Sequence, residues 1–236
     1  FDSAIAKHRD GDAAKSVDLA DRACRFGHGE ACFQLGGWLK PDKPSQARAA
    51  YDRACAANHA AGCNNAGLLR LAEKGVTDKL RLEAAGLLSK ACAGDVTAAC
   101  TLAGRLLARS DPQAAVKLYR RGCDLDSVAA CRELGVTLYA GKGTPVDKTR
   151  AANLFAAACR LGDGIACRNF AAMALRGDGI GKNQVLAGER MHRGCKLGDG
   201  AACLAFGQML CAGVGVDKDH FHAANFFKVG CARGSK

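Results

Sequence analysis

Cysteine is the residue type in this sequence that could do the most chemistry. The chain holds 14 cysteines in 236 residues, and cysteine thiols can form disulfides, bind metal ions or act as nucleophiles. Zinc sites use short spacings, such as two cysteines separated by two residues, and no such pair occurs here. Because of this, we predict neither a metal site nor a cofactor. Two cysteines separated by seven residues recur six times instead: Cys24/Cys32, Cys55/Cys63, Cys92/Cys100, Cys123/Cys131, Cys159/Cys167 and Cys195/Cys203.

Other residue sets that support catalysis are incomplete. A serine β-lactamase carries the motifs S-x-x-K, S-D-N and K-T-G, and only the fragment Lys148-Thr149 of the last is present. His220 and His222 form an H-x-H pair, but no Asp or third His follows at a useful spacing. The glycine-rich stretch 177–182 lacks the spacing of a phosphate loop. The residues therefore favour a protein that is not an enzyme, and we assign no catalytic residue.

The charge of the chain limits its partners. A formal net charge of +11 favours acidic partners, membrane surfaces or nucleic acid. Nucleic-acid readers interleave basic residues with stacking aromatics, whereas Trp38 is the single tryptophan and no basic run exceeds two residues. We therefore predict no nucleic-acid binding. No apolar run approaches the ~18 residues of a membrane helix, so we predict no transmembrane segment.

The cysteines mark a repeat. First cysteines, including Cys231, recur at intervals of 31, 37, 31, 36, 36 and 36 residues, and such periods are typical of solenoids. Small and apolar residues eight and four positions before each first cysteine form one stripe of a helix. That helix is predicted to stop three residues after the cysteine, at residue types that tolerate a left-handed backbone. These residues are Gly27, Asn58, Asp95, Asp126, Gly162, Gly198 and Gly234.

A second helix is predicted to begin at each second cysteine. Four residues after that cysteine stands a small residue, which would let a neighbouring backbone approach closely: Gly36, Gly67, Gly104, Gly135, Ala171 and Gly207. Loops with G-x-G or proline follow, and the next helix is predicted to begin at an N-cap residue. These N-cap residues are Asp111, Asp147, Asn183 and Asp219. We predict an all-α fold, a right-handed α/α superhelical solenoid over residues 1–236 with about seven helical hairpins and incomplete units at both ends.

Geometry favours disulfides within this repeat. Residues eight apart in one continuous helix are ~12 Å apart, beyond the ~7 Å that a disulfide spans. With a helix stop between them, the two cysteines can meet across a corner, and each bridge would contribute about 2–3 kcal/mol. We predict that the twelve paired cysteines staple the solenoid. Cys211 is predicted to be a buried apolar side chain and Cys231 the orphan of a truncated pair; a Cys211–Cys231 bridge and a reactive thiol are the alternatives.

Basic residues recur two positions before the first cysteine: Arg22, Arg53, Lys90, Arg121 and Arg193. One interpretation is a solvated face near helix C-termini, where cations suit the macrodipole. The other is a ladder of positive charge for an acidic partner. His28 and His59, which follow helix stops, are expected to lie on the surface.

The pattern A-x3-[LYF]-x2-[AG]-C-x2-[GND]-x4-C-x2-[LF]-[GA], followed by G-x-G-x3-[DN], resembles the Sel1-like repeat in its cysteine-rich form. The resemblance runs from about Asp12 to Gly234 and implies a superhelix similar to tetratricopeptide arrays, with a disulfide in each repeat. Short loops after Lys40 and Ser110 depart from the pattern, as does Ala171. Similar proteins include the Helicobacter cysteine-rich proteins and a mitochondrial respiratory-chain assembly factor.

Solenoids expose extended concave surfaces that bind partners. We expect an exported scaffold that binds a protein or peptide, with an acidic partner as one option, in the periplasm or outside the cell; the mitochondrial intermembrane space is the alternative. The resemblance also implies a penicillin-binding protein, weak β-lactamase or cell-wall-glycan binder, or a redox or haem-linked assembly factor. Predicted concave residues lie one and two positions after the second cysteine, where asparagine can clamp a peptide backbone. They are Gln34, Asn64, Asn65, Arg132, Glu133, Arg168 and Asn169.

Overall fold

The computed structural model describes residues 1–9 and 11–234, and the regular structure of these residues is entirely helical. The predicted all-α fold is therefore confirmed. The helices are α1 (Asp2–Arg9), α2 (Ala13–Arg25), α3 (Gly29–Leu39), α4 (Pro44–Ala56), α5 (Ala60–Leu71), α6 (Asp78–Ala93), α7 (Thr97–Leu107), α8 (Pro112–Asp124), α9 (Val128–Ala140), α10 (Lys148–Arg160), α11 (Gly164–Arg176), α12 (Gln184–Lys196), α13 (Gly200–Ala212) and α14 (His220–Ala232). Within the described ranges, none of these helices is long and apolar enough to cross a bilayer.

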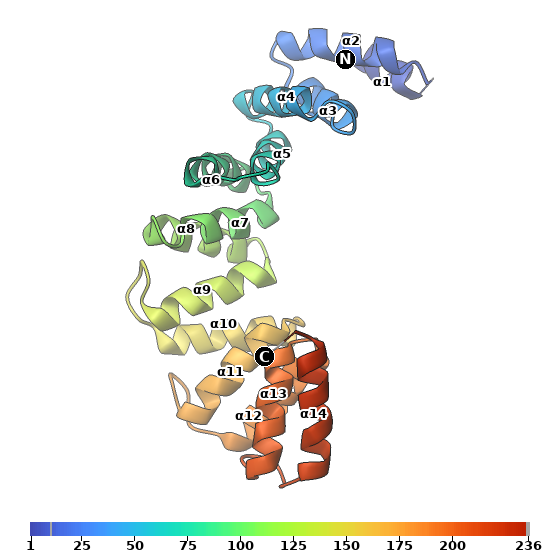
Figure 1. Ribbon diagram of the computed structural model, residues 1–236. Coiled ribbons are helices and arrows are strands. Elements are labelled where there is room, and N and C mark those ends of the chain that lie inside the picture. Colours follow the sequence, from blue (N-terminus) through green and yellow to red (C-terminus); the bar gives the residue numbers. More distant parts are fainter. Residues whose placement is uncertain (10, 235–236) are drawn as a thin grey trace. The chain divides into compact units, whose positions relative to one another are not determined.

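The helices fall into two compact units, Phe1–Leu125 and Asp126–Lys236. In each unit, an odd-numbered helix packs against the even-numbered helix that follows it, and the pair forms a helical hairpin (Figure 1). We call the odd-numbered helices A helices and the even-numbered helices B helices. Unit 1 holds the hairpins of α1 to α8, and unit 2 holds those of α9 to α14. That residues 1–236 form one solenoid stays a prediction.

The helix stops lie where the sequence predicts them. The third residue after each first cysteine has a positive φ in every repeat, and this is the left-handed conformation that ends a helix. The values are 83° for Gly27, 59° for Asn58, 64° for Asp95, 61° for Asp126, 98° for Gly162, 98° for Gly198 and 75° for Gly234. The corner between the two cysteines therefore follows from local sequence alone.

Side chains cap the helices that follow. Asp111, Asp147, Asn183 and Asp219 each accept a hydrogen bond from the backbone N–H three residues on, at 2.9 Å, which confirms them as N-caps.

Two A helices are capped by histidine. Nδ1 of His28 accepts from the N–H of Ala31, and Nδ1 of His59 accepts from the N–H of Gly62, both at 3.1 Å. The side chain of His59 is only 22% exposed, and its Nε2 lies 2.8 Å from Oε2 of Glu30. His28 is exposed, as expected, whereas His59 is half-buried because capping and the contact with Glu30 draw its ring inward.

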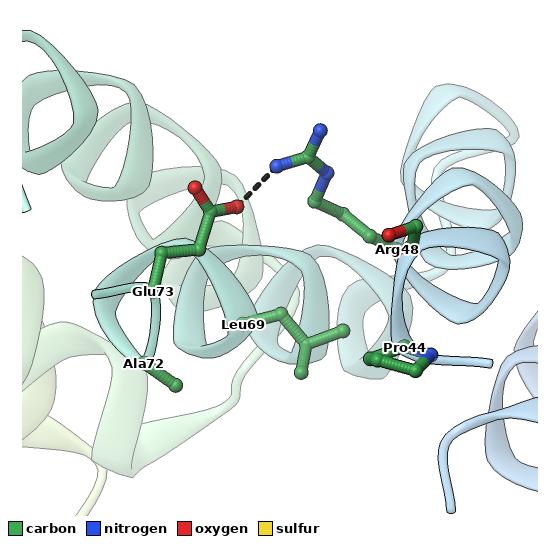
Figure 2. A pocket seen from close by; sticks show the side chains of 6 residues that line it. Pro44, Arg48, Leu69, Ala72 and Glu73 are labelled. Carbon is green, nitrogen blue, oxygen red and sulfur yellow. Dashed lines mark hydrogen bonds and ion pairs between the residues drawn. The ribbon is translucent and has the colours of Figure 1, made fainter. Parts of the chain in front are cut away.

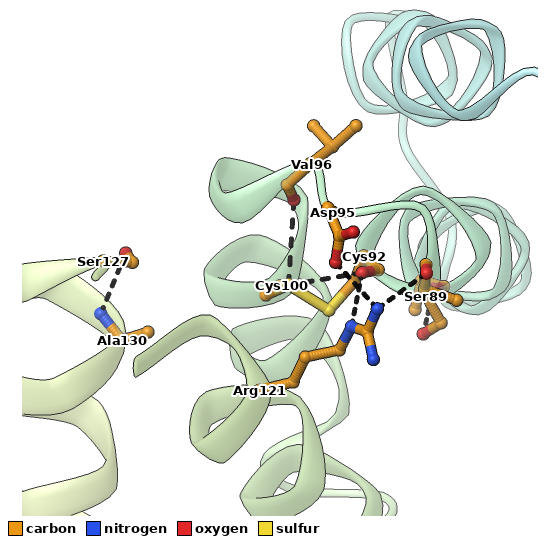
Figure 3. Close-up of a disulfide and its surroundings, with 10 residues drawn as sticks. Ser89, Cys92, Asp95, Val96, Cys100, Arg121, Ser127 and Ala130 are labelled. Atoms are coloured by element: carbon orange, nitrogen blue, oxygen red, sulfur yellow. Dashed lines mark hydrogen bonds and ion pairs between the residues drawn. A yellow bond between two sulfur atoms is a disulfide. The ribbon is translucent and has the colours of Figure 1, made fainter. Parts of the chain in front are cut away.

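Disulfides close the corners between hairpins. The bridges Cys24–Cys32, Cys55–Cys63, Cys92–Cys100, Cys159–Cys167 and Cys195–Cys203 have Cα–Cα distances of 4.4 to 4.7 Å. Cys123 and Cys131 are disulfide-bonded as well. Each of the five bridges joins the end of a B helix to the start of the next A helix, as Figure 3 shows for Cys92 and Cys100. The predicted staples are confirmed.

The two remaining cysteines are free thiols. Cys211 is half-buried and Cys231 is exposed. Cys211 packs against the apolar cluster of α11 to α14 as an apolar side chain would, but it is half-buried rather than buried as predicted. The alternative of a Cys211–Cys231 bridge is wrong.

The small residue four positions after the second cysteine faces a large side chain of its own hairpin. A Cβ atom on Gly36 would lie 2.6 Å from Cε1 of Tyr51, and one on Gly207 would lie 2.8 Å from Cε1 of Phe227. Backbone also lies close, as expected: a Cβ atom on Gly67 would lie 3.2 Å from the carbonyl oxygen of Ala84, and one on Gly207 would lie 3.2 Å from that of Ala223. The position admits both a large side chain and the backbone of the partner helix.

The arginines two positions before the first cysteine also link hairpins. Arg121 donates from Nε to the carbonyl oxygen of Cys92 at 2.8 Å and from Nη2 to that of Ala93 at 2.8 Å (Figure 3). Arg193 donates to the carbonyl oxygen of Arg160 at 3.1 Å. These carbonyls end the preceding B helix, where cations are stabilising. The macrodipole interpretation is confirmed for these two residues, with the preceding B helix as the partner.

Candidate binding groove

The predicted binding residues of unit 1 are hydrogen-bonded within the unit. Nε2 of Gln34 donates to Oε1 of Glu30 at 2.8 Å, and Nδ2 of Asn64 lies 3.4 Å from Oδ1 of Asn65. Asn65 is also hydrogen-bonded to the phenol of Tyr51, whose pKa is raised by burial. These side chains lie on α3 and α5, as the repeat predicts, and their binding role stays a prediction.

In unit 2, Arg132 and Arg168 hold neighbouring A helices together. Nη1 of Arg132 donates to Oδ2 of Asp163 at 2.6 Å, and Nε of Arg168 donates to Oδ2 of Asp199 at 2.7 Å. Both aspartates are N-caps, and their side chains are 10% and 8% exposed. Glu133 accepts from Nη2 of Arg132 at 3.2 Å. Charge-assisted hydrogen bonds of this kind are strong, so these side chains have a structural role whether or not they also bind a partner.

Asn169 lines a pocket of about 190 Å³ between α9 and α11. We call this pocket the α9–α11 groove. Its floor is formed by the apolar side chains of Phe155 and Met173, which are only 2% and 1% exposed. Val136 beside it is 40% exposed. The lining residues are Val136, Tyr139, Phe155, Asn169, Ala172, Met173 and Arg176.

A charged network closes one end of the groove around Asp178. The carboxylate accepts from Nε of Arg176 at 2.8 Å, from Nζ of Lys148 at 2.7 Å and from the phenol of Tyr139 at 2.8 Å. These donors hold the pKa of Asp178 far below its usual range. The carboxylate in turn raises the pKa of Arg176 and of Lys148. The network therefore holds the side chains of Tyr139 and Arg176 in place at the rim.

The loop after α11 explains how Asp178 reaches this place. Gly177 ends the helix with a φ of 77°, and Gly179 has a φ of 68°. A Cβ atom on Gly179 would overlap the backbone of Lys148. Only glycine allows the loop to lie so close to the start of α10, and this places the carboxylate of Asp178 beside Tyr139.

A larger hollow in unit 1 has a different character. It measures about 410 Å³ and is lined by Pro44, Ser45, Arg48, Leu69, Ala72 and Glu73. Arg48 and Glu73 form an ion pair across it (Figure 2). Because these two charged groups are paired with each other, this hollow offers a ligand fewer free polar groups than the α9–α11 groove does. In the described part of the chain, no group of three or more His, Cys, Asp or Glu side chains could hold a metal ion.

Analysis of the sequence identified Asn169 but missed the rest of the groove. The repeat pattern singles out neither Tyr139 nor Asp178. Val136, five positions after the second cysteine, gives no clear signal, because the same position carries the exposed polar Gln208 in one repeat and the exposed apolar Leu68 in another.

The fold is that of an α-helical repeat protein. A family model described as the Sel1 repeat matches residues 98–127, 128–163, 164–199 and 200–235. These matches cover more than half of the chain, and the chain belongs to the Sel1 repeat family. The family resemblance inferred from the cysteine pattern is thus confirmed. No curated protein matches the chain.

Solved structures share the fold. A protective antigen with an SLR fold from uropathogenic Escherichia coli, c5321, has a TM-score of 0.77 at 19% identity over 93% of this chain and 49% of its own. This chain therefore spans about half the length of that protein. A Sel1 repeat protein from Oxalobacter formigenes has a TM-score of 0.73 at 19% identity, covering 97% of this chain and 95% of its own. Helicobacter pylori cysteine-rich protein B is 28% identical over 56% of this chain and 98% of its own, with a TM-score of 0.45.

Proposed function

We propose that this protein is an exported, disulfide-stapled scaffold that binds an extended segment of a partner protein in the α9–α11 groove. One observation carries the proposal: an apolar floor with the exposed Val136 beside it lies between two polar groups, Asn169 and Arg176. Peptide-binding sites commonly combine an apolar pocket with a few polar groups that fix orientation.

The chemistry of the groove suits a peptide. The amide of Asn169 has a donor and an acceptor, so it can pair with the N–H and C=O of a peptide backbone. The apolar floor would receive one side chain of the segment. The bridges Cys159–Cys167 and Cys195–Cys203 restrain both ends of the hairpin that contains α11. A restrained site loses little conformational entropy on binding, so the scaffold favours affinity.

The disulfides indicate an oxidising compartment, because cytosolic reductants keep thiols reduced. Buried bridges recur along both units. We assign the protein to the periplasm or the cell exterior, with the mitochondrial intermembrane space as the alternative. Its partner would then be a protein of the same compartment.

The test compares two variants in capture of partners from the periplasmic or secreted fraction, with identification by mass spectrometry. Ala172→Phe would fill the groove. Gln208→Phe places the same side chain at the equivalent position of the next repeat, where Gln208 is exposed. We expect Ala172→Phe to lose a partner that the native protein and Gln208→Phe both retain. Equal capture by all three proteins would overturn the proposal.

A further inference from the structure

We infer that the α9–α11 groove selects a segment in which an acidic side chain lies within two residues of an apolar one. The inference rests on the proposed function and adds the chemical class of the ligand. It is carried by the size of the pocket, the spacing of the polar groups along α11 and the distribution of charge at the two ends.

The pocket limits the apolar group to one side chain. A volume of about 190 Å³ is large enough for a leucine or a phenylalanine side chain but not for two. Its floor of Phe155 and Met173 presents a ring and a thioether. Both pack well against aliphatic and aromatic groups.

The spacing along α11 limits the length of the segment. Asn169, Ala172 and Arg176 line the same side of the helix. Asn169 and Arg176 are seven positions apart on the helix, which corresponds to about 10 Å at ~1.5 Å per residue. An extended peptide covers that distance in about three residues. A segment whose backbone meets Asn169 and whose apolar side chain lies beside Ala172 therefore brings its next one or two residues to Arg176.

The charge at that end favours a carboxylate. Arg176 and Lys148 share the single carboxylate of Asp178, and their side chains are 54% and 44% exposed. Nε of Arg176 is bound to Asp178 and Nη2 lies 3.2 Å from the phenol of Tyr139. Among the described residues, Nη1 has no partner. Two cations against one anion leave a net positive charge with donors that are already oriented, and a carboxylate can accept from such donors.

The opposite end of the two helices has no comparable excess of positive charge, because Arg168 there is paired with Asp199. There Arg132 contacts two carboxylates, those of Asp163 and Glu133. An acidic side chain is therefore favoured at the end with Arg176 rather than at this end. The two ends together predict which way the acidic residue lies relative to the apolar one.

The probe is a synthetic peptide, Ser-Glu-Ser-Leu-Ser-Glu-Ser, acetylated and amidated so that it carries no terminal charge. Its symmetric order presents a glutamate on either side of the leucine in both chain directions. Binding is followed by NMR of the protein labelled with 13C at the methionine methyl groups. The chain has three methionines, Met173, Met191 and Met209, and of these only Met173 lines the groove.

We expect the methyl signal of Met173 to shift in a saturable way, with Met191 and Met209 unchanged. Replacing the glutamates of the peptide by glutamine is expected to weaken binding about fivefold, and replacing the leucine by serine to abolish it. Arg176→Gln should bind the glutamate peptide about fivefold more weakly. Arg109→Gln, at the equivalent repeat position just after the end of α7, should bind as the native protein does. A thermal melt of both variants establishes that they are folded.

The outcomes separate this inference from the proposed function. Equal affinity for the glutamate and glutamine peptides would overturn the acidic selectivity, while the shift of Met173 would still support peptide binding. A peptide that has no acidic side chain and ends in Leu with a free C-terminal carboxylate distinguishes a carboxylate of the chain terminus from one of a side chain. If it binds more tightly than the glutamate peptide, the assignment to an acidic side chain is overturned. If no peptide shifts the methyl signal of Met173, the inference fails. The proposed function fails as well only if Ala172→Phe captures every partner that the native protein captures.

Discussion

Gly135 on α9 and Phe155 on α10 fit together so closely that a Cβ atom on the glycine would lie 2.8 Å from Cε1 of the ring. The same ring forms part of the floor of the α9–α11 groove. Phe155 therefore belongs both to the packing contact that recurs in the repeats and to the candidate binding site. Ala171 occupies the corresponding position of the next hairpin and packs in one cluster with Met191, whose unbranched side chain can adapt to a methyl group.

Gly135→Ala is expected to destabilise the protein by about 1–2 kcal/mol, because overpacking a core costs more than the gain in helix propensity. Gly86 is the control. It lies inside α6 with no atom within 4 Å of a built Cβ, so Gly86→Ala should stabilise by about 0.5–1 kcal/mol. Urea unfolding measures both values. The packing argument fails if the two substitutions shift stability in the same direction.

Removal of one staple should weaken the scaffold. Replacing both Cys159 and Cys167 by alanine is expected to lower the free energy of unfolding by about 2–3 kcal/mol, since the bridge no longer restrains the unfolded chain. Cys211→Ala changes a half-buried free cysteine and serves as the control for the loss of a sulfur atom. Urea unfolding without reductant is the measurement. Equal stability of the double variant and the native protein would contradict the role given to the bridge.

Thiol counting separates a stapled scaffold from a redox protein. Cys231 is exposed and Cys211 is half-buried. In the native state, we expect one thiol to react rapidly with a disulfide reagent and a second to react slowly. Denaturant without reductant should reveal two thiols, because the remaining cysteines are disulfide-bonded. More than two would show that some bridges are open and would favour redox chemistry.

The surroundings of His192 indicate that the stability of unit 2 depends on pH. Its ring stacks on Phe206 with centroids 4.7 Å apart and meets Phe226 edge-on at 5.6 Å. Burial, with the nearby Lys196, lowers the pKa of His192. A histidine whose pKa is lowered by folding contributes its full stability above its ordinary pKa of 6.5. That stability is lost as the pH falls from there through the lower folded value.

We therefore expect the melting temperature of the native protein to fall between pH 7.5 and pH 5.5 by more than that of His192→Phe, which keeps a ring but cannot be protonated. His220 is exposed, so His220→Gln should retain the native pH dependence. Identical pH profiles for the native protein and His192→Phe would remove His192 as the cause.

Features that depend on neighbours in the sequence could be predicted from it. The positive φ of Asn58 and Asp95 and the capping by Asp147 are local choices of residue type. The disulfides follow from these corners, because a stop between two cysteines eight residues apart brings them together. Contacts between residues that are close in the sequence can therefore be predicted from it.

Contacts between residues that are distant in the sequence could not be predicted in the same way. Arg132 meets Asp163 across 31 residues, and Tyr139 meets Asp178 across 39. Which side chains meet depends on how one hairpin stacks on the next, and the period of the cysteines does not specify that stacking. For this reason, the row of basic residues allows two interpretations, and the contact of Arg121 with the end of α6 supports the macrodipole interpretation for that residue.

A photocrosslinking amino acid placed in unit 2 tests the binding site most directly. Benzoylphenylalanine at Val136 would lie in the groove, whereas at Leu161, which is 70% exposed, it would lie at the corner after α10. In the periplasmic or secreted fraction, we expect one partner to be crosslinked from position 136 and not from position 161. A partner crosslinked from 161 and never from 136 would contradict the account.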